Sequence, residues 1–380
     1  MTIRSWFLLS KLFLFWIVAV SVDFTRASSE KLGEGSYGVV TVDPKHSKYV
    51  IKTMVDKDRK LIEPELNFHM HASELLAKGQ NIPNILIAEA FFWERDVLNL
   101  RFPRAEKIAG PGMLSEEAEE MHFVTNKKKF LKDIASALTW LHEQNIAHCD
   151  IKLPNIMYYQ QAYVLIDFGS VQSRVHVIDE IEKIHKTTSW YRSPELLLNN
   201  HSFPCEGDIW STAISYLHLF YDTRLFKYDG ELDKDLTFSK AIKFQQNIML
   251  INLSLFLDQS LFKDTNLEEI KHLQASAYNP PRKKSALVKT REQIIAKTID
   301  INLLSQFNNR KYIKDRLLQL FRDELMIEED GFMSEEDELI IEGDEFMSEE
   351  EAELLSAMMM IPPNMRIMAS SILHHEFLSE

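Results

Sequence analysis

The feature that most limits the fold of this chain is a glycine pattern near its start, G-x-G-x-x-G-x-V over residues 33–40. A β-hairpin of this kind lets backbone N–H groups approach phosphate oxygens, because glycine places no side chain in the way. The glycines alone also suit a dinucleotide-binding fold, but that fold requires a helix directly after them. Here the chain continues as strand to Val42, turns over residues 43–46, and forms a second β-branched strand ending at Lys52. The sequence therefore predicts a glycine-tipped hairpin within a β-sheet.

A second group of polar residues lies near the middle of the chain. Asp150, Lys152 and Asn155 follow one another closely, and Asp167-Phe168-Gly169 comes twelve residues after Asn155. One carboxylate can accept the proton of an attacking hydroxyl, while an amide oxygen and a second carboxylate can hold Mg²⁺. The apolar residues 163–166 place Asp167 at a strand end, where a metal ligand is held rigidly. This spacing indicates transfer of a phosphoryl group.

A third stretch, W-Y-R-S-P-E, occupies residues 190–195. Together with the glycine hairpin and the central polar group, it resembles the motifs of eukaryotic-type serine/threonine protein kinases, and is most similar to the cyclin-dependent and MAP kinase-like group. The resemblance covers about residues 30–378. It implies an α+β, bilobal protein kinase fold, with a small, mainly β N-lobe over about residues 30–103 and a larger, mainly α C-lobe over about residues 106–378.

The resemblance also implies a reaction. ATP would be the phosphate donor, Mg²⁺ the metal ion, and the serine and threonine hydroxyls of a protein substrate the acceptors. A lysine two residues after the catalytic aspartate, as at Lys152, is typical of the serine/threonine branch. Two alternatives stay open from the sequence: a nucleotide-binding pseudokinase that acts as a scaffold, and a kinase of small molecules.

The catalytic and nucleotide-binding residues are assigned by this resemblance. Asp150 would be the catalytic base and Lys152 would face the transferred phosphate, while Asn155 and Asp167 would hold the metal. The residues expected around the nucleotide are Leu32, Gly33, Glu34, Gly35, Ser36, Tyr37, Gly38, Val40, Lys52, Phe102 and Ala105.

A substrate shelf is expected where the third motif ends. Its residues are Thr188, Arg192, Glu195 and Arg366. Glu195 and Arg366 are far apart in the sequence, but the resemblance implies that they form a buried ion pair across the C-lobe. Breaking such a pair would strand a buried charge and cost several kcal/mol.

Lys52 needs a carboxylate partner on the helix that follows it, and the sequence offers Glu63, Glu65 and Glu74. Glu74 keeps nearer the family's usual distance from the loop at residues 82–85. We favour Glu65, because the residue before it, Pro64, suits the first position of a helix.

Two positions depart from the family pattern together. Cys149 stands directly before Asp150, where regulated kinases carry an arginine that clamps a phosphorylated residue of the activation loop. Lys183 stands where related kinases place that phosphorylated residue. We therefore expect an enzyme that does not require activation-loop phosphorylation. A weakened or inactive kinase is the alternative explanation of the same pair of changes.

Residues 221–348 fit the resemblance poorly. The segment 323–353 carries 16 acidic and no basic side chains, and its motif at residues 330–336 returns at residues 344–350. Ser348 and Glu351 are expected to form a capping box at the start of a helix. The acidic repeat could bind a basic partner or hold the kinase in an autoinhibited state, although a solvated insertion explains such a run more simply. The net charge of −14 argues against nucleic acid as the main partner.

The first 29 residues form a separate segment, in which residues 5–22 are mostly apolar. A signal peptide, a membrane anchor and a plain N-terminal extension all fit this pattern. The kinase body is expected in the cytoplasm or nucleus, with membrane association through residues 5–22 or a secretory route as the alternatives. Two cysteines, Cys149 and Cys205, are too few for a disulfide framework and fit a reducing compartment.

Overall fold

The computed structural model describes residues 30–35, 38–54, 59–110, 121–173, 191–197, 202–221, 252–253, 256–257, 301–328 and 346–379. These residues form two compact units. The first unit holds the described residues up to Gly79 together with Leu86–Arg104, and the second holds Gln80–Ile85 and the described residues from Ala105 onward. The first is built on a β-sheet and the second is mainly helical, so the predicted α+β, two-lobed organisation is confirmed.

The boundary between the units differs from the prediction at one place, the segment Gln80–Ile85. Although it lies between elements of the first unit, it pairs with the second. Ile85 forms a parallel bridge with Leu165, and the Asn84 side chain donates to the carbonyl oxygen of Tyr163 at 3.0 Å. These long-range hydrogen bonds attach the segment to a strand that is 79 or more residues away, which no local pattern could indicate.

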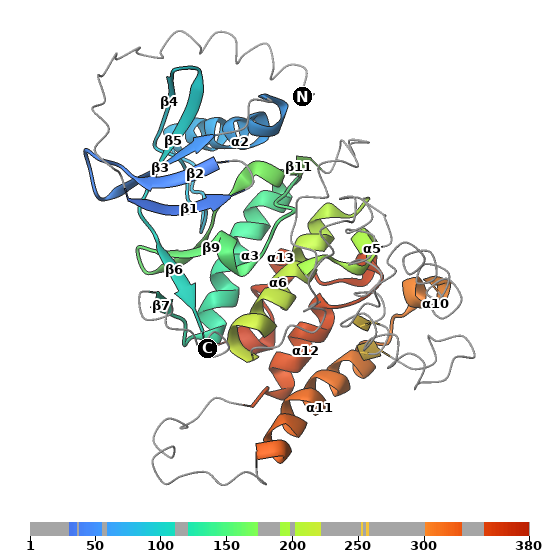
Figure 1. Ribbon diagram of the computed structural model, residues 1–380. Coiled ribbons are helices and arrows are strands. Elements are labelled where there is room, and N and C mark those ends of the chain that lie inside the picture. Colours follow the sequence, from blue (N-terminus) through green and yellow to red (C-terminus); the bar gives the residue numbers. More distant parts are fainter. Residues whose placement is uncertain are drawn as a thin grey trace, which may run out of the picture. The chain divides into compact units, whose positions relative to one another are not determined.

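The first unit has a five-stranded sheet with the order β1-β2-β3-β5-β4, in which every neighbouring pair is antiparallel. Its strands are β1 (Lys31–Gly35), β2 (Gly38–Val42), β3 (Tyr49–Met54), β4 (Ala90–Glu94) and β5 (Val97–Pro103). Val40 on β2 lies opposite Lys52 on β3, and Lys52 in turn lies opposite Leu100 on β5. The predicted glycine hairpin is therefore present in the pairing of β1 with β2 (Figure 1). It lies next to Lys52 because β2 in turn pairs with β3.

One long helix, α2 (Arg59–Ala77), accompanies this sheet (Figure 1). Its buried residues recur every three or four positions, as expected for a helix that turns one face inward. They are Ile62, Glu65, Phe68, His69 and Ala72. Four of these are apolar or aromatic, whereas Glu65 is a carboxylate on the same buried face, so it must have a partner there.

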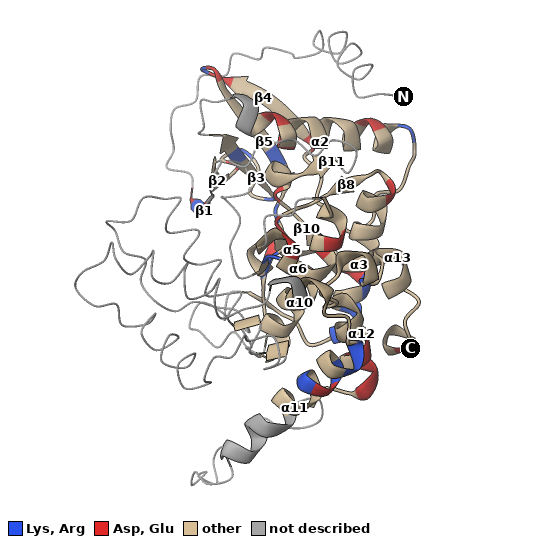
Figure 2. Ribbon diagram, turned by 90° about the vertical axis from the view of Figure 1, so that its right-hand side faces the viewer, with Lys and Arg blue, Asp and Glu red and all other residues tan. Residues whose placement is uncertain are grey.

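The second unit is organised around helix α6 (Pro204–Tyr221), most of whose residues are buried. Helix α3 (Lys127–Glu143) packs beside it, with the rings of Phe130 and Phe220 5.7 Å apart. Helix α12 (Glu349–Met358) also packs against α6, and α11 (Arg310–Glu328) packs against α12 (Figure 2). The core of this unit therefore joins segments separated by more than a hundred residues.

Short strands and helices complete the second unit, where η marks a 3₁₀ helix. They are β6 (Glu106–Ala109), β7 (His122–Phe123), β8 (Ile146–Ala147), η3 (Leu153–Asn155), β9 (Ile156–Tyr159), β10 (Ala162–Leu165), η4 (Phe168–Ser170), β11 (Gln172–Ser173), α5 (Pro194–Leu197), α10 (Ile301–Gln306), η7 (Pro363–Met365), α13 (Ala369–Ile372) and η8 (Glu376–Leu378). The strands form two small sheets, ordered β10-β9-β6-β7 and β11-β8.

The start of α12 corrects part of the capping prediction. Ser348 is the N-cap, and its side chain accepts a hydrogen bond from the backbone N–H of Glu351. The Glu351 carboxylate does not return to Ser348. It accepts hydrogen bonds from the hydroxyls of Tyr216 and Tyr221 on α6, both at 2.6 Å. A buried carboxylate gains more from two hydroxyl donors than from one exposed backbone N–H, so only half of the capping box forms.

Among the residues that the structure describes, none of the helices combines the length and the apolar character needed to span a membrane. Residues 1–29 and most of the segment 222–300 lie outside that part of the chain.

The pairing of β2 with β3 leaves no room for a side chain at Gly38. A Cβ atom there would lie 2.5 Å from the carbonyl oxygen of Thr53. We expect Gly38→Ala to lower the free energy of unfolding by about 1–3 kcal/mol, because the two strands must move apart. Chemical denaturation of the full chain measures this.

Gly33→Ala is the matched control for that measurement. No atom lies within 4 Å of a Cβ built at Gly33. Its effect should stay within about 0.5 kcal/mol, as is usual for surface substitutions. Equal decreases in the free energy of unfolding of the two variants would contradict a steric clash at Gly38 as the cause.

Candidate active site

The centre of the candidate site is the Asp150 carboxylate, which lies in the loop between β8 and η3. The Lys152 ammonium lies 2.9 Å from its Oδ2 atom, and the Asn155 side-chain amide donates to the same oxygen at 3.0 Å. Asn155 also donates to the backbone carbonyl of Asp150 at 2.8 Å. Pro154 lies in the first turn of η3 and favours the tight turn that brings Asn155 back to Asp150. The structure thus brings Lys152 and Asn155 to the carboxylate of Asp150.

The electrostatics of this group favour a proton acceptor. Burial raises the pKa of Asp150 above its ordinary value, and the nearby Lys152 ammonium opposes that rise. The neighbouring Asp167 carboxylate raises it further. A carboxylate with a raised pKa holds a proton more tightly, so it is a better general base than an exposed aspartate.

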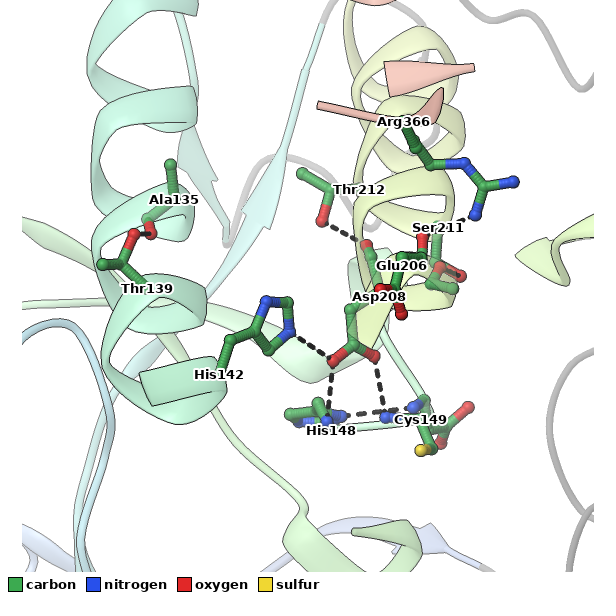
Figure 3. A network of polar contacts seen from close by, with 12 residues as sticks. Ala135, Thr139, His142, His148, Cys149, Glu206, Asp208, Ser211, Thr212 and Arg366 are labelled. Atoms are coloured by element: carbon green, nitrogen blue, oxygen red, sulfur yellow. Dashed lines mark hydrogen bonds and ion pairs between the residues drawn. The ribbon is translucent and has the colours of Figure 1, made fainter. Parts of the chain in front are cut away.

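A buried carboxylate on α6 holds the loop that carries Asp150. Asp208 accepts hydrogen bonds at 2.8 Å from the backbone N–H groups of His148 and Cys149, one on each oxygen. The His142 ring lies 3.0 Å from the same carboxylate, so helix α3 is joined to this point as well (Figure 3). The sequence motifs do not identify this role of Asp208. An aspartate within a mostly buried helix is the signal that could reveal this role.

Asp167 lies two residues after β10, close to the predicted strand end. Its backbone has φ 64° and ψ 75°, a left-handed conformation that is uncommon outside glycine. The residues around it are firmly held, because Phe168 is buried and its ring lies 4.9 Å from that of His148. The ring of His148 in turn lies 3.0 Å from the carbonyl oxygen of Ile166. Asp167 is therefore fixed beside Asp150 by packing on both sides.

The residues at this point can supply some of the oxygen ligands of a Mg²⁺ ion. Asn155 uses its amide nitrogen on Asp150, so its amide oxygen is the atom that can face a cation. Together with the Asp167 carboxylate this gives two oxygen ligands, which suits magnesium. Within the described ranges no group of three or more His, Cys, Asp or Glu side chains gathers to hold a metal. The site fits a magnesium ion that completes its coordination with water and phosphate oxygens.

In the first unit, Lys52 is paired with Glu65. The Lys52 Nζ atom lies 2.7 Å from one oxygen of Glu65 and 2.8 Å from the other. Glu65 is fully buried, whereas Glu63 and Glu74 are exposed. Glu65 is the predicted partner, but the predicted helix start is wrong, because Pro64 lies inside α2 and not at its first position. What selects Glu65 is its position on the buried face of the helix.

Several predicted nucleotide-binding residues are also placed. Val40 lies in β2, beside the strand that carries Lys52, and Gly33 and Gly38 lie in the hairpin. Phe102 is buried at the end of β5, where its ring is 5.0 Å from that of His69 on α2. The remaining placed members of the predicted set are Leu32, Glu34 and Gly35 on β1, and Ala105, the first residue of the second unit after β5. The predicted residues Ser36, Tyr37 and Thr188 lie outside the described part of the chain, as does Lys183.

The predicted ion pair of the substrate shelf is present in the second unit. Arg366 donates to both oxygens of Glu195, at 2.8 and 3.0 Å, and also to the carbonyl oxygen of Met360. Both charged groups are buried. Arg192, three residues before Glu195, is buried too. Burial lowers the pKa of its guanidinium to about 10, and the nearby Asp150 carboxylate opposes that change.

The raised pKa of Asp150 predicts a pH-dependent gain in stability for Asp150→Asn. A raised carboxyl pKa contributes stability that is fully present below its ordinary value of 3.8 and is lost as the pH rises through the folded value. At pH 7 the buried charge therefore costs free energy, which a neutral asparagine avoids. The free energy of unfolding should be higher for the variant at pH 7, and the difference should shrink in acid.

Denaturation curves of the two proteins at several pH values measure this difference. Asp315→Asn, at an exposed aspartate of α11, is the control and should show no such trend. A variant that is less stable than the wild type at pH 7 would show that the pairing with Lys152 outweighs the cost of burial.

Known proteins are similar to this chain in sequence and in fold. The chain matches the protein kinase domain family over residues 26–378. It is 27% identical to Cyclin-dependent kinase-like 1 of Caenorhabditis elegans, over 67% of this chain and 71% of that protein. It is also 27% identical to Serine/threonine-protein kinase PSK1 of Saccharomyces cerevisiae, over 64% of this chain but only 18% of that longer protein.

A solved structure of the CAK complex from Chaetomium thermophilum, bound to ATP-gamma-S, has the same fold. One of its chains superposes with a TM-score of 0.55 and 19% sequence identity, over 92% of this chain and 90% of that chain. The family match covers far more than half of the residues, and the fold agrees with it. The chain therefore belongs to the protein kinase family.

Proposed function

We propose that this protein transfers the γ-phosphate of ATP to serine and threonine hydroxyls of protein substrates. The observation that carries the proposal is the arrangement around Asp150, whose carboxylate is joined to Lys152 and Asn155 and lies beside Asp167. A base, a cation and two oxygen ligands for a metal are the parts that phosphoryl transfer requires. The Lys52–Glu65 pair in the first unit supplies the remaining charged group.

In the proposed reaction, Asp150 orients the acceptor hydroxyl and receives its proton as the oxygen attacks the γ-phosphorus. The bond from that phosphorus to the bridging oxygen breaks, and ADP leaves with this oxygen. Lys152, held by the same carboxylate, offsets negative charge on the phosphoryl group as it moves. Bound Mg²⁺ would neutralise charge on the phosphate oxygens, with Asn155 and Asp167 as its protein ligands. Most of the acceleration would come from this alignment, because such transition states need little help from a base.

The nucleotide side of the reaction is assigned to the first unit. Lys52 would hold the α- and β-phosphates, and Glu65 fixes the direction of its ammonium group. The glycine hairpin would cover the phosphates with backbone N–H groups. ATP as the donor is supported by the family and by the ATP-gamma-S that the CAK complex binds.

Serine and threonine are proposed as acceptors on two grounds. Lys152 is the lysine typical of that branch, and the relatives named above include a serine/threonine-protein kinase. A protein rather than a small molecule is proposed as substrate because Glu195 and Arg366 build the segment that supports a peptide in this family. The complete set of Lys52, Asp150, Asn155 and Asp167 argues against the pseudokinase alternative.

The proposed activity is tested with Asp150→Asn. We expect the wild type to transfer phosphate from ATP to serine- and threonine-containing peptides of a randomised library. The variant should lose roughly 10²-fold or more of this rate, the usual effect of removing a positioned base. ATP binding, measured by calorimetry, should persist in the variant.

Asp315→Asn serves again as the control and should keep the wild-type rate. A wild type that binds ATP but transfers no phosphate, under conditions where a known kinase is active, would instead support the pseudokinase alternative.

We further propose that the activity does not require phosphorylation of the activation loop. The Cys149 thiol cannot act as the cation that would clamp a phosphate. Burial raises the pKa of this thiol well above its ordinary value, and the adjacent Asp208 carboxylate raises it further. A neutral thiol carries no positive charge to pair with a phosphate, as an arginine would. The residues at positions 149 and 183 therefore support the same conclusion.

Treatment with a phosphatase tests this second proposal. The rate of peptide phosphorylation should stay within about twofold after all phosphate has been removed, because the loop carries no phosphate switch. Mass spectrometry verifies the removal, and a kinase that depends on loop phosphorylation provides the positive control. Loss of activity in the treated protein, restored by an upstream kinase, would refute the proposal.

Membrane association through residues 5–22, and binding of a basic partner by residues 323–353, stay predictions. The first segment and much of the second lie outside the described residues.

A further inference from the structure

Helix α6 is mostly apolar and buried, but one of its faces carries polar side chains in a line. Asp208, Ser211 and His218 lie at positions i, i+3 and i+10 of the helix, which share a face. Asp208 holds the backbone of the catalytic loop, as described above, and Ser211 lies one turn farther along (Figure 3). Polar groups on a buried helix need hydrogen-bond partners. The partners of Ser211 and His218 therefore show what this face of α6 holds in place.

Ser211 and His218 both bind the same residue, Tyr191. The Ser211 hydroxyl donates to the backbone carbonyl of Tyr191 at 2.7 Å. The Tyr191 hydroxyl lies 2.8 Å from the Nδ1 atom of His218. Because a phenol can both donate and accept, this bond forms with either tautomer of the imidazole. Tyr191 is buried, so its main chain and its side chain are both tied to α6.

Tyr191 immediately precedes Arg192, the buried shelf residue that lies within electrostatic reach of Asp150. At its other end, the same segment is held by the ion pair of Glu195 with Arg366. The segment 191–195 is therefore held at both ends, at Tyr191 by Ser211 and His218 and at Glu195 by Arg366. One face of α6 thus binds the catalytic loop through Asp208 and the substrate shelf through Tyr191.

We infer that His218 is a positioning residue for the protein substrate: through the Tyr191 hydroxyl it sets the place of the shelf relative to Asp150. This inference rests on the proposed kinase function and adds to it the residue that aligns the acceptor peptide. Without the bond, the backbone before Arg192 gains freedom, and the peptide must then fix it on binding. The penalty should fall on peptide affinity, because the partners of Lys52, Asn155 and Asp167 are unchanged.

The test measures the KM for peptide and the KM for ATP in His218→Leu, Tyr191→Phe and the double variant. The substrate is the best-phosphorylated peptide from the randomised library. Each single change should raise the KM for peptide about three- to tenfold, the effect of one lost hydrogen bond. The KM for ATP should stay within about twofold. Because both changes remove the same bond, the double variant should be no worse than either single one.

Two further variants separate positioning from general packing. His218→Asn keeps a polar group near the place of Nδ1 and should recover much of the peptide KM. Ser215→Ala is the matched control, since Ser215 lies on the same face of α6 but its hydroxyl donates to Ser211 within the helix itself. It should leave both KM values unchanged.

The outcomes distinguish this inference from the proposed function. A wild type that transfers no phosphate overturns both. An active wild type whose variants show unchanged peptide KM, additive effects, or equal rises in both KM values overturns the role of His218 alone. Thermal unfolding verifies that each variant is folded, and if His218→Leu does not fold, Tyr191→Phe decides, because it removes only one oxygen atom.

Discussion

The catalytic half of this protein depends on one buried carboxylate. Asp208 lies on a helix with almost no other charge, and both of its oxygens accept hydrogen bonds from the backbone of the loop before Asp150. Hydrogen bonds to a charged group are each worth roughly 1.5–3 kcal/mol, which is enough to hold a strained backbone. That strain is present at Cys149, whose φ of 64° is in the left-handed region. The base is therefore positioned by the interior of the protein and not by its own loop.

The same arrangement explains why burial and charge coexist at the site. Asp150, Glu65, Glu195 and Arg366 would each be costly if they were alone in the core. Glu65 has Lys52, Glu195 has Arg366, and Asp150 has Lys152 and Asn155. These partners stabilise the buried charged groups by ion pairs and hydrogen bonds. The groups can therefore stay ionised inside the protein. Rigid placement follows from the same bonds, because each charge has only one geometry in which its partners are reached.

The region with the poorest resemblance to the family is nevertheless built into the core. Phe321 belongs to residues 221–348, and its buried ring lies 4.3 Å from that of Tyr221 on α6. Glu351 of helix α12, at the end of the acidic segment 323–353, has its carboxylate buried against Tyr216 and Tyr221. The C-terminal end of the same helix, α12, leads to the carbonyl oxygens of Met360 and Ile361, which bind Arg366. An insertion that looks peripheral in the sequence is thereby connected to the helix that organises the site. Its acidic residues do not all behave as solvated surface.

The spacing of Asp150, Lys152, Asn155 and Asp167, and the glycine hairpin before Lys52, were predictable from the sequence, because short loops and strand pairs are specified by nearby residues. The reason for choosing Glu65 was wrong, and the roles of Asp208 and His218 were not found. Those facts depend on which face of a helix is buried and on what packs against it from more than twenty residues away. Local sequence patterns determined which residues can carry out the chemistry of this protein. Only the tertiary structure decided which buried polar groups hold those residues in place. The reason is that a buried polar group needs a hydrogen-bond partner, and here that partner is distant in the sequence.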